Sequence, residues 1–268
     1  MEDWFGFLNQ IGAWPVTPAG EEQWSGTGKV AIVSGGSGGI GRETVLRLAA
    51  SGHDVVASYS SSEDEAQALV ADSESLPGKV LIMKADVADA AGVAALFDKA
   101  EEAFGGVDVL VTAAGIFKPT TFAEADEAHF DREMAVNLRG TFLCLVQAAR
   151  RLRDGGRIVA ISTTTLALKP PGYGIYNAAK GAIEAMIAIL AKEVGSRGIT
   201  ANCVAPGPIE TEFFLKCKSK EEIAARAAGA PAGRLGQPND IADAIELLIS
   251  GKAQWISGQS VRANGGMA

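Results

Sequence analysis

Short apolar runs alternate with longer amphipathic stretches from Lys29 onward. The apolar runs are rich in β-branched residues and cover 29–34, 54–59, 79–85, 108–112, 157–162 and 199–205. Between them, apolar residues recur with helical spacing over 40–51, 63–75, 90–104, 126–152 and 174–196. Strands that alternate with helices of this length predict βαβ units and a parallel sheet. Continuous apolar runs are typical of strands that helices cover on both faces.

Two further segments complete the pattern. A last strand is expected at 258–262, which brings the number of strands in the sheet to seven. The segment 208–237 interrupts the alternation with prolines and glycines around a short helical pattern, and we interpret it as a substrate flap. We therefore predict an α/β fold with a seven-stranded, parallel, doubly wound sheet and helices on both faces.

The length of 268 residues suits one domain of this kind. We predict a single domain over residues 28–268, preceded by an aromatic-containing extension over residues 1–27. The aromatic side chains of the extension either pack on the domain or a neighbouring subunit, or they contact a partner or the substrate channel. These side chains are Trp4, Phe5, Phe7, Trp14 and Trp24.

The net charge of −8 and the pI of about 4.9 narrow the range of partners. A nucleic-acid-binding protein usually carries a basic surplus, and an anionic membrane surface repels an acidic protein. No apolar run reaches the roughly 18–20 residues that a transmembrane helix needs. The N-terminus begins Met-Glu-Asp without the basic region of a secretory signal, so we predict a cytoplasmic protein.

Cysteine and histidine are sparse. Cys144, Cys203 and Cys217 lack the spacing of a metal site, and their odd number favours free thiols in a reducing compartment. His53 and His129 are the only histidines, and neither lies in a motif of a hydrolase triad or of a zinc-dependent dehydrogenase. We therefore expect no metal site.

A glycine-rich loop follows the first strand and leads directly into a helix. Glycines permit a tight turn and a close approach of the backbone to a pyrophosphate, and the helix N-terminus offers N–H groups and partial positive charge. A flexible loop is the alternative, but the position between strand and helix predicts the dinucleotide-binding loop of a Rossmann fold. The expected cofactor contacts are Gly35, Ser37, Gly38, Gly39, Ile40 and Gly41.

Two motifs together resemble the short-chain dehydrogenase/reductase family. One is the Gly-x-x-x-Gly-x-Gly spacing of Gly35, Gly39 and Gly41, and the other is Tyr-x-x-x-Lys at Tyr176 and Lys180. The resemblance covers about residues 28–266 and implies a nicotinamide-dependent oxidoreductase that moves a hydride to or from a carbonyl or alcohol carbon. It also implies cofactor contacts at Asp86, Val87, Ala113, Ala114, Gly115, Tyr176, Lys180, Pro206, Gly207, Ile209 and Thr211.

The end of the second strand bears on the choice of cofactor. It has no carboxylate that would bind the ribose hydroxyls of NAD(H). Hydroxyls and the following helix N-terminus can instead accept a 2′-phosphate, so we prefer NADP(H), with contacts from Ser58, Tyr59, Ser60 and Ser61. NAD(H) stays open as the alternative, because no Arg or Lys lies in the glycine loop or at this strand end. The serines can also be a plain helix N-cap.

Tyr176 and Lys180 lie four residues apart in a helical pattern and therefore share one helix face. A carbonyl that accepts a hydride also needs a proton, and a nearby ammonium lowers the pKa of a tyrosine from its ordinary value of ~10. The family resemblance implies that Tyr176 is the general acid/base and that Lys180 tunes its pKa and binds the nicotinamide ribose. The alternative for this spacing is a surface tyrosine beside a lysine.

The resemblance also implies two supporting residues. A hydroxyl that polarises the substrate oxygen is expected 13 residues before the tyrosine, at Thr163, with Ser162 and Thr164 as neighbouring alternatives. Asn137, inside the predicted helix 126–152, corresponds to an asparagine thought to hold a water in a proton relay. A local helix bend is the alternative role of this asparagine.

Three functions remain open at this point. We favour an NADPH-dependent carbonyl reductase, similar to the 3-oxoacyl-thioester reductases or acting on an apolar or aromatic ketone. A dehydrogenase that oxidises an alcohol, sugar or steroid is the first alternative, and a catalytically idle NADP(H) sensor or scaffold is the second. An apolar or aromatic substrate is favoured over a highly charged one by Leu166, Leu168, Pro170, Phe213 and Phe214.

Two kinds of protein partner are expected. Arg151, Arg153 and Arg197 could dock an acidic acyl-carrier protein, or they could be solvated charges at helix ends. By family resemblance, the helices predicted at 126–152 and 174–196 pair across a two-fold axis, which gives a homodimer or homotetramer.

Overall fold

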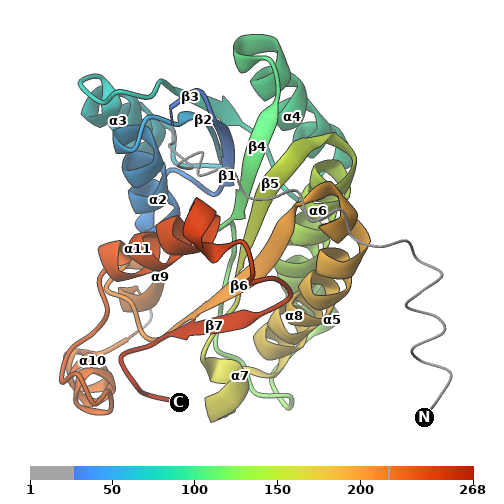
Figure 1. Ribbon diagram of the computed structural model, residues 1–268. Coiled ribbons are helices and arrows are strands. Elements are labelled where there is room, and N and C mark those ends of the chain that lie inside the picture. The colour runs from blue at the N-terminus through green and yellow to red at the C-terminus, as the bar shows by residue number, and fades with distance from the viewer. Residues whose placement is uncertain (1–26, 217) are drawn as a thin grey trace, which may run out of the picture.

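A parallel sheet forms the centre of the computed structural model, which describes residues 27–216 and 218–268. Its seven strands lie in the order β3-β2-β1-β4-β5-β6-β7, and every neighbouring pair is parallel (Figure 1). The prediction of a doubly wound α/β fold with seven parallel strands is confirmed. Residues 1–26 of the predicted extension and Cys217 lie outside the described ranges.

The strands fall close to the predicted apolar runs. They are β1 (Val30–Ser34), β2 (Asp54–Tyr59), β3 (Val80–Lys84), β4 (Val107–Thr112), β5 (Leu152–Ile161), β6 (Thr200–Pro206) and β7 (Ser260–Ala263). Strand β5 begins at Leu152, well before its predicted start at 157, because Leu152 pairs with Val107 ahead of a shift in register.

The helices predicted between the strands are present as α2 (Gly39–Ala50), α3 (Glu63–Ser73), α4 (Ala90–Phe104), α5 (Glu127–Glu133), α6 (Thr141–Arg151) and α8 (Gly174–Val194). Further helical segments are α7 (Thr165–Leu168), α9 (Glu212–Leu215), α10 (Lys220–Ala228), α11 (Pro238–Ile249) and the 3₁₀ turns η2 (Gly195–Arg197) and η3 (Gly251–Ala253). Within the described parts of the chain, no helix has both the length and the apolar character needed to cross a lipid bilayer.

Alternate residues of the strands face two separate apolar layers. In β1, Val30 and Ile32 join the layer of α4, α6 and α8, whereas Ala31 and Val33 join the layer of α2, α3 and α11. All four side chains are buried. Figure 1 shows the two groups of helices on opposite sides of the sheet. Because both faces are covered, the strands are apolar at successive positions.

The helix predicted over 126–152 is present over 127–151, but it is not α-helical throughout. Between α5 and α6, Met134–Gly140 form a π-helical segment (η1), which fits an additional residue into a helical turn. Asn137 lies at the centre of this segment and is fully buried. The prediction of a helix is confirmed, but the π-helical segment was not predicted, because apolar periodicity does not distinguish a π-turn inside a helix from the α-helix around it.

The segment 208–237, called the flap below, is closed at its base. The Gly236 amide donates to the Pro208 carbonyl at 2.9 Å, and the Glu210 amide donates to the Gly236 carbonyl at 2.8 Å. Between these bonds the chain forms α9 and α10, and α11 begins directly afterwards with Pro238 in its first turn. The flap is therefore a loop whose two ends are held together beside the end of β6.

The glycine loop generates a first prediction. A Cβ at Gly41 would lie 2.1 Å from the Gly35 carbonyl oxygen, so Gly41→Ala forces backbone to move. We expect a loss of about 1–3 kcal/mol, which lowers Tm by roughly 2–4 °C per kcal/mol. Thermal unfolding followed by circular dichroism measures this change.

The matched control is Gly181→Ala in the middle of α8. There the nearest atom to a new Cβ is 3.6 Å away, in the Leu166 side chain, so alanine fits. Alanine in a helix interior is more favourable than glycine by roughly 0.5–1 kcal/mol, so Tm should hold or rise. An equal loss of Tm in the two variants would show that the close approach of residue 41 to the Gly35 carbonyl does not cause the destabilisation.

Candidate active site

A cavity of about 800 Å³ lies along the carboxyl ends of the strands. Strand β1 has β2 on one side and β4 on the other, so this edge is the topological switch point where open α/β sheets bind ligands. Most predicted site residues line the cavity. They are Gly35, Ser37, Gly38, Gly39, Ile40, Gly41, Ser60, Ser61, Ala113, Ala114, Gly115, Ser162, Thr163, Tyr176, Lys180, Pro206, Gly207, Ile209 and Thr211.

A second group of predicted site residues is not on the cavity lining: Ser58, Tyr59, Asp86, Val87 and Asn137. Ser58 accepts hydrogen bonds from the Gly35 amide at its hydroxyl and from the Gly36 amide at its carbonyl, at 3.3 and 2.8 Å. Ser58 therefore holds the glycine loop against the end of β2 through these two hydrogen bonds. The Asp86 carboxylate accepts from the Ala88 amide at 2.9 Å, and Val87 packs in the apolar layer around α4.

The glycine loop is shaped for a phosphate. Gly35 has a φ of +69°, and a Cβ there would lie 2.6 Å from the Ala114 backbone nitrogen, so the loop lies tightly against the end of β4. The N-cap residue of α2 is Gly38, which has no side chain to bind the first N–H groups of the helix. Uncapped N–H groups at a helix N-terminus are suited to phosphate oxygens. The loop therefore fits the pyrophosphate of a dinucleotide.

The end of β2 presents hydroxyls to the same cavity. The serines at 60–62 line it beside the start of α3, together with Arg42 from α2. The Arg42 guanidinium contacts the Asp72 carboxylate. Arg42 lies one residue beyond the glycine loop, so a search for cations in the loop itself misses it. The hydroxyls and the guanidinium favour the binding of a phosphate group at this end of the cavity. The carboxylate of Glu65, in the first turn of α3, also lines the cavity and would repel such a group.

Tyr176 and Lys180 lie together on α8. The buried Lys180 ammonium donates to the Ile161 carbonyl at 2.7 Å, and its Nζ lies 5.7 Å from the centre of the Tyr176 ring. Burial lowers the pKa of Lys180 to about 8. Burial also raises the pKa of Tyr176, and the charges of Glu133 and Tyr173 add to the rise. The expected fall in the tyrosine pKa is therefore wrong for this arrangement, and Tyr176 keeps its proton.

Three neighbouring hydroxyls after β5 have different partners. The Thr163 hydroxyl lies beside the Tyr176 phenol and acts to lower its pKa, and it hydrogen-bonds the Thr165 hydroxyl at 3.0 Å. Ser162 donates to the Glu184 carboxylate at 2.5 Å, and Thr164 donates to a β6 carbonyl at 3.1 Å. Successive residues of an extended chain point to opposite sides. Thr163 is accordingly the hydroxyl that lies with Tyr176, and the other two are engaged elsewhere.

Asn137 connects the π-helical segment to the loop after β4. Its side-chain oxygen accepts from the Ile116 amide, and its side-chain nitrogen donates to the Ile116 carbonyl, both at 2.8 Å. The Asn137 carbonyl accepts from the Thr141 hydroxyl at 2.9 Å. Both polar atoms of the side chain are thus engaged by the loop. Asn137 acts on the site by holding Ile116, and with it Phe117, in the cavity wall.

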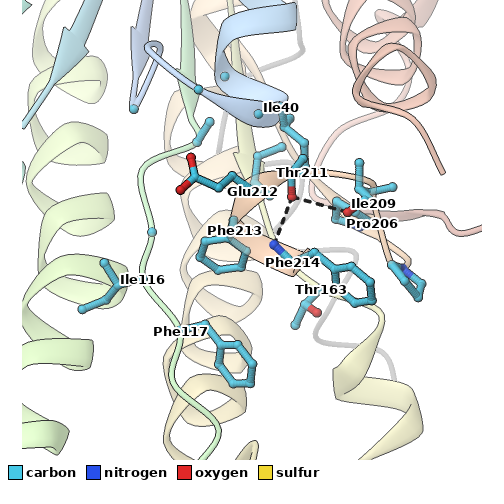
Figure 2. A pocket seen from close by; sticks show the side chains of 18 of the residues that line it. Ile40, Ile116, Phe117, Thr163, Pro206, Ile209, Thr211, Glu212, Phe213 and Phe214 are labelled. Carbon is cyan, nitrogen blue, oxygen red and sulfur yellow. Dashed lines mark hydrogen bonds between the residues drawn. The ribbon is translucent and has the colours of Figure 1, made fainter. Parts of the chain in front are cut away.

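Aromatic rings surround the cavity beside Thr163 (Figure 2). The ring centre of Phe117 lies 4.4 Å from that of Tyr173, 5.0 Å from that of Tyr176 and 6.4 Å from that of Phe213. The sequence did not mark Phe117 or Tyr173 as site residues, because only the folded loops bring them to the wall. The predicted substrate-side residues on the lining are Leu168, Pro170, Phe213 and Phe214, without Leu166.

Comparison with known proteins places this geometry in a family. A family model described as enoyl-(acyl carrier protein) reductase matches residues 35–268. A protein of Picea abies, named short-chain type dehydrogenase/reductase, is 42% identical over 249 residues, which cover 89% of this chain and 92% of that protein. The chain belongs to the short-chain dehydrogenase/reductase family.

Two other proteins of this kind match over a similar extent. The NADPH-dependent aldehyde reductase-like protein, chloroplastic, of Arabidopsis thaliana is 40% identical over 89% of this chain and 94% of its own. The crystal structure of a short chain dehydrogenase from Burkholderia cenocepacia J2315 in complex with NADP has a TM-score of 0.86 and 34% identity, over 91% of this chain and 99% of that chain. As a member of the short-chain dehydrogenase/reductase family, the protein is an oxidoreductase that acts on carbonyl or CH–OH groups.

The hydroxyls after β5 generate a second prediction. We expect Thr163→Ala to lower kcat about 100-fold, the usual effect of removing one donor to a developing oxyanion. Thr163→Ser keeps the hydroxyl and should restore most of the rate. Steady-state turnover followed at the nicotinamide absorbance measures both variants. The control is Ser162→Ala, whose lost hydroxyl is bound to Glu184. A larger loss of kcat in Ser162→Ala than in Thr163→Ala would show that Ser162, and not Thr163, is the hydroxyl donor.

The buried ammonium of Lys180 generates a third prediction. Because its pKa in the folded protein lies below the ordinary value of 10.5, at about 8, the charge opposes folding below pH 8. Between pH 8 and 10.5 the unfolded chain binds a proton that the folded chain does not, so this opposition fades as pH rises. We expect Lys180→Met to abolish turnover and to raise Tm at pH 7 by about 2–4 °C, with a smaller difference near pH 10.

The exposed Lys99 on α4 supplies the comparison for this experiment. Lys99→Met removes one positive charge at the surface and should change neither turnover nor Tm appreciably. Thermal unfolding of both variants between pH 7 and pH 10 gives the result. A lower Tm for Lys180→Met at pH 7 would show that its hydrogen bond to Ile161 stabilises the fold more than its desolvation destabilises it.

Proposed function

We propose that the protein is an NADPH-dependent reductase that transfers a hydride to the carbonyl carbon of an apolar or aromatic aldehyde or ketone. One observation carries the proposal. Tyr176 and Thr163 line the same cavity as the uncapped start of α2 and the serines at 60–62, so a dinucleotide and a carbonyl compound share one space. The aromatic wall around Phe117 suits a planar or apolar substrate.

The cofactor preference follows from the end of β2. Ser60, Ser61 and the N-terminus of α3 can bind a 2′-phosphate, with Arg42 beside them on the cavity lining. Glu65 opposes such a phosphate, and NAD(H) is the alternative that a direct comparison tests. The NADPH-dependent relative from Arabidopsis thaliana and the NADP complex from Burkholderia cenocepacia support the preference for NADP(H).

When bound, the reduced nicotinamide supplies the hydride. The residues that would hold its carboxamide are Ile209, through its backbone, and Thr211, through its hydroxyl, after β6. Tyr176 donates its proton to the carbonyl oxygen, and Thr163 stabilises the negative charge that develops there. The ammonium of Lys180, 5.7 Å from the Tyr176 ring centre, favours the phenolate left after proton donation. Hydride and proton together convert the carbonyl to an alcohol.

The state of Tyr176 favours reduction over the oxidative alternative. Burial and the nearby charges of Glu133 and Tyr173 raise the pKa of its phenol, so the side chain begins as a proton donor. Oxidation of an alcohol would require the phenolate at the start. An idle sensor would need no proton donor beside the cavity, so the same residue argues against that function.

Two kinds of protein partner were predicted, a carrier protein and further copies of this chain, and the structure supports them differently. Each of Arg151, Arg153 and Arg197 contacts a carboxylate of this chain, so we leave a carrier-protein docking site out of the proposal. Phe142 on α6 and Ile189 on α8 are 47% and 55% exposed, which supports pairing of these helices in a homodimer or homotetramer. A cytoplasmic location remains a prediction.

The test of the function is a titration with NADPH and NADH, followed by turnover on a panel of aldehydes and ketones. We expect NADPH to bind at least about tenfold more tightly, because an additional charged contact has roughly this value. Tyr176→Phe should lose turnover by about 100-fold or more and still bind NADPH. A preference for NADH would overturn the cofactor proposal, and near-normal turnover in Tyr176→Phe would overturn the mechanism.

A further inference from the structure

Glu133, the last residue of α5, carries a buried carboxylate that is not on the cavity lining. Burial raises the pKa of this carboxyl group, whereas the imidazole of His129, whose Nε2 lies 3.5 Å from a carboxylate oxygen, acts to lower it. Withdrawing a carboxylate from water is unfavourable unless its oxygens are bound within the protein. The groups that Glu133 binds therefore indicate what this side chain contributes to the molecule.

The loop after β4 is bound by two side chains that lie four residues apart. Glu133 accepts a hydrogen bond from the Lys118 amide at 3.3 Å. Asn137 binds both the amide and the carbonyl of Ile116, each at 2.8 Å. Phe117 is the residue between these two anchors, and Figure 2 shows it beside Ile116 on this loop. The backbone is thus held on either side of Phe117.

A third hydrogen bond holds the loop further along. The Thr120 amide donates to the carbonyl of Gly172, the residue before Tyr173, at 2.9 Å. The amides of Ile116, Lys118 and Thr120 are therefore bound in turn by η1, by α5 and by the segment that leads into α8. The bond from Glu133 is the middle one of the three, and it is the one directly after Phe117.

The position of Phe117 matters because its ring adjoins the proton donor. The ring centre lies 5.0 Å from that of Tyr176 and 4.4 Å from that of Tyr173, and both pairs of rings are tilted. Aromatic contacts depend on the distance and the angle between the rings. A shift of the backbone at Lys118 would therefore change the wall beside Tyr176.

We propose that Glu133 is a positioning residue that determines specificity for aromatic carbonyl compounds: by binding the Lys118 amide, it holds Phe117 where the ring of the substrate packs. The inference rests on the proposed function, since it takes the carbonyl oxygen to lie at Tyr176. A ring attached to that carbonyl then lies against Phe117. Because Glu133 acts through the loop, its loss weakens the binding of a ring and leaves hydride and proton transfer unchanged.

Two variants separate the hydrogen bond of Glu133 from its charge. Glu133→Gln keeps a side-chain oxygen that can accept from the Lys118 amide, whereas Glu133→Met fills a similar volume without a strong acceptor. Both variants remove the charge that helps to raise the pKa of the Tyr176 phenol. A difference between them therefore reports on the hydrogen bond alone. Glu133→Leu takes the place of Glu133→Met if the latter does not fold.

The test compares benzaldehyde with propanal, which has no ring, as substrates of the whole protein with NADPH at pH 7. We expect Glu133→Met to raise KM for benzaldehyde about fivefold, the value of an aromatic contact. Its kcat and its KM for propanal should stay at the parental values. Glu133→Gln should keep the parental KM for both aldehydes. Glu127→Met, at the exposed start of the same helix, is the matched control and should change neither KM.

Phe117→Ala shows whether Glu133 acts through Phe117. This variant alone should also raise KM for benzaldehyde, and Glu133→Met added to it should cause no further rise, because the two residues act on one contact. A fully additive rise in the double variant would overturn the inference. An equal rise for propanal, or equal effects of Glu133→Gln and Glu133→Met, would overturn it as well.

Failure of the proposed function is distinguishable from failure of this inference. If the parent protein reduces neither aldehyde with NADPH, the reductase proposal fails. Binding of benzyl alcohol, measured by NMR titration of the parent protein, Glu133→Met and Glu133→Gln, then decides the inference alone. Weaker binding in Glu133→Met that Glu133→Gln restores supports it. Equal binding by the parent protein and Glu133→Met, or no binding by the parent protein, overturns it.

Discussion

The common direction of the seven strands is the constraint on which the site depends. Because all neighbouring strands are parallel, their carboxyl ends meet at one edge, and segments far apart in the sequence share a cavity there. The register within the sheet is equally decisive. Thr163 and Ser162 are adjacent, yet one lies beside the Tyr176 phenol and the other hydrogen-bonds Glu184. A slip of β5 by one residue would exchange these two environments.

The same burial that builds the site determines its proton chemistry. Lys180 is buried and Tyr176 is half-buried in the cavity wall, and desolvation favours the neutral form of each, so it lowers the pKa of the lysine and raises that of the tyrosine. The tyrosine is thereby kept as an acid, while the lysine is close to losing its proton near neutral pH. The pair is therefore sensitive to any charge that a ligand brings. A scaffold with two complete apolar layers supports this destabilising arrangement.

Most of the fold could be predicted because apolar runs and glycine positions report directly on buried strands and tight turns. The π-helical segment around Asn137 could not, since its extra residue leaves the apolar spacing on either side intact. The same limit applies to the site. The glycine loop, Tyr176 and Lys180 are set by local spacing, whereas Arg42 and Phe117 reach the lining only through the folded chain. Burial also reversed the expected pKa shift of Tyr176, because sequence spacing does not show how much water a side chain loses.

The carboxylate of Glu184 links three parts of the chain. It accepts hydrogen bonds from Ser162 after β5 and from Ser260 in β7, at 2.5 and 2.6 Å, and it lies one helical turn after Lys180 on α8. Strand β6 lies between β5 and β7, so this carboxylate joins two strands that are not neighbours in the sheet. The strand end that carries Thr163 is therefore tied to the edge strand of the sheet, and a change at Ser260 can alter the site without touching its lining.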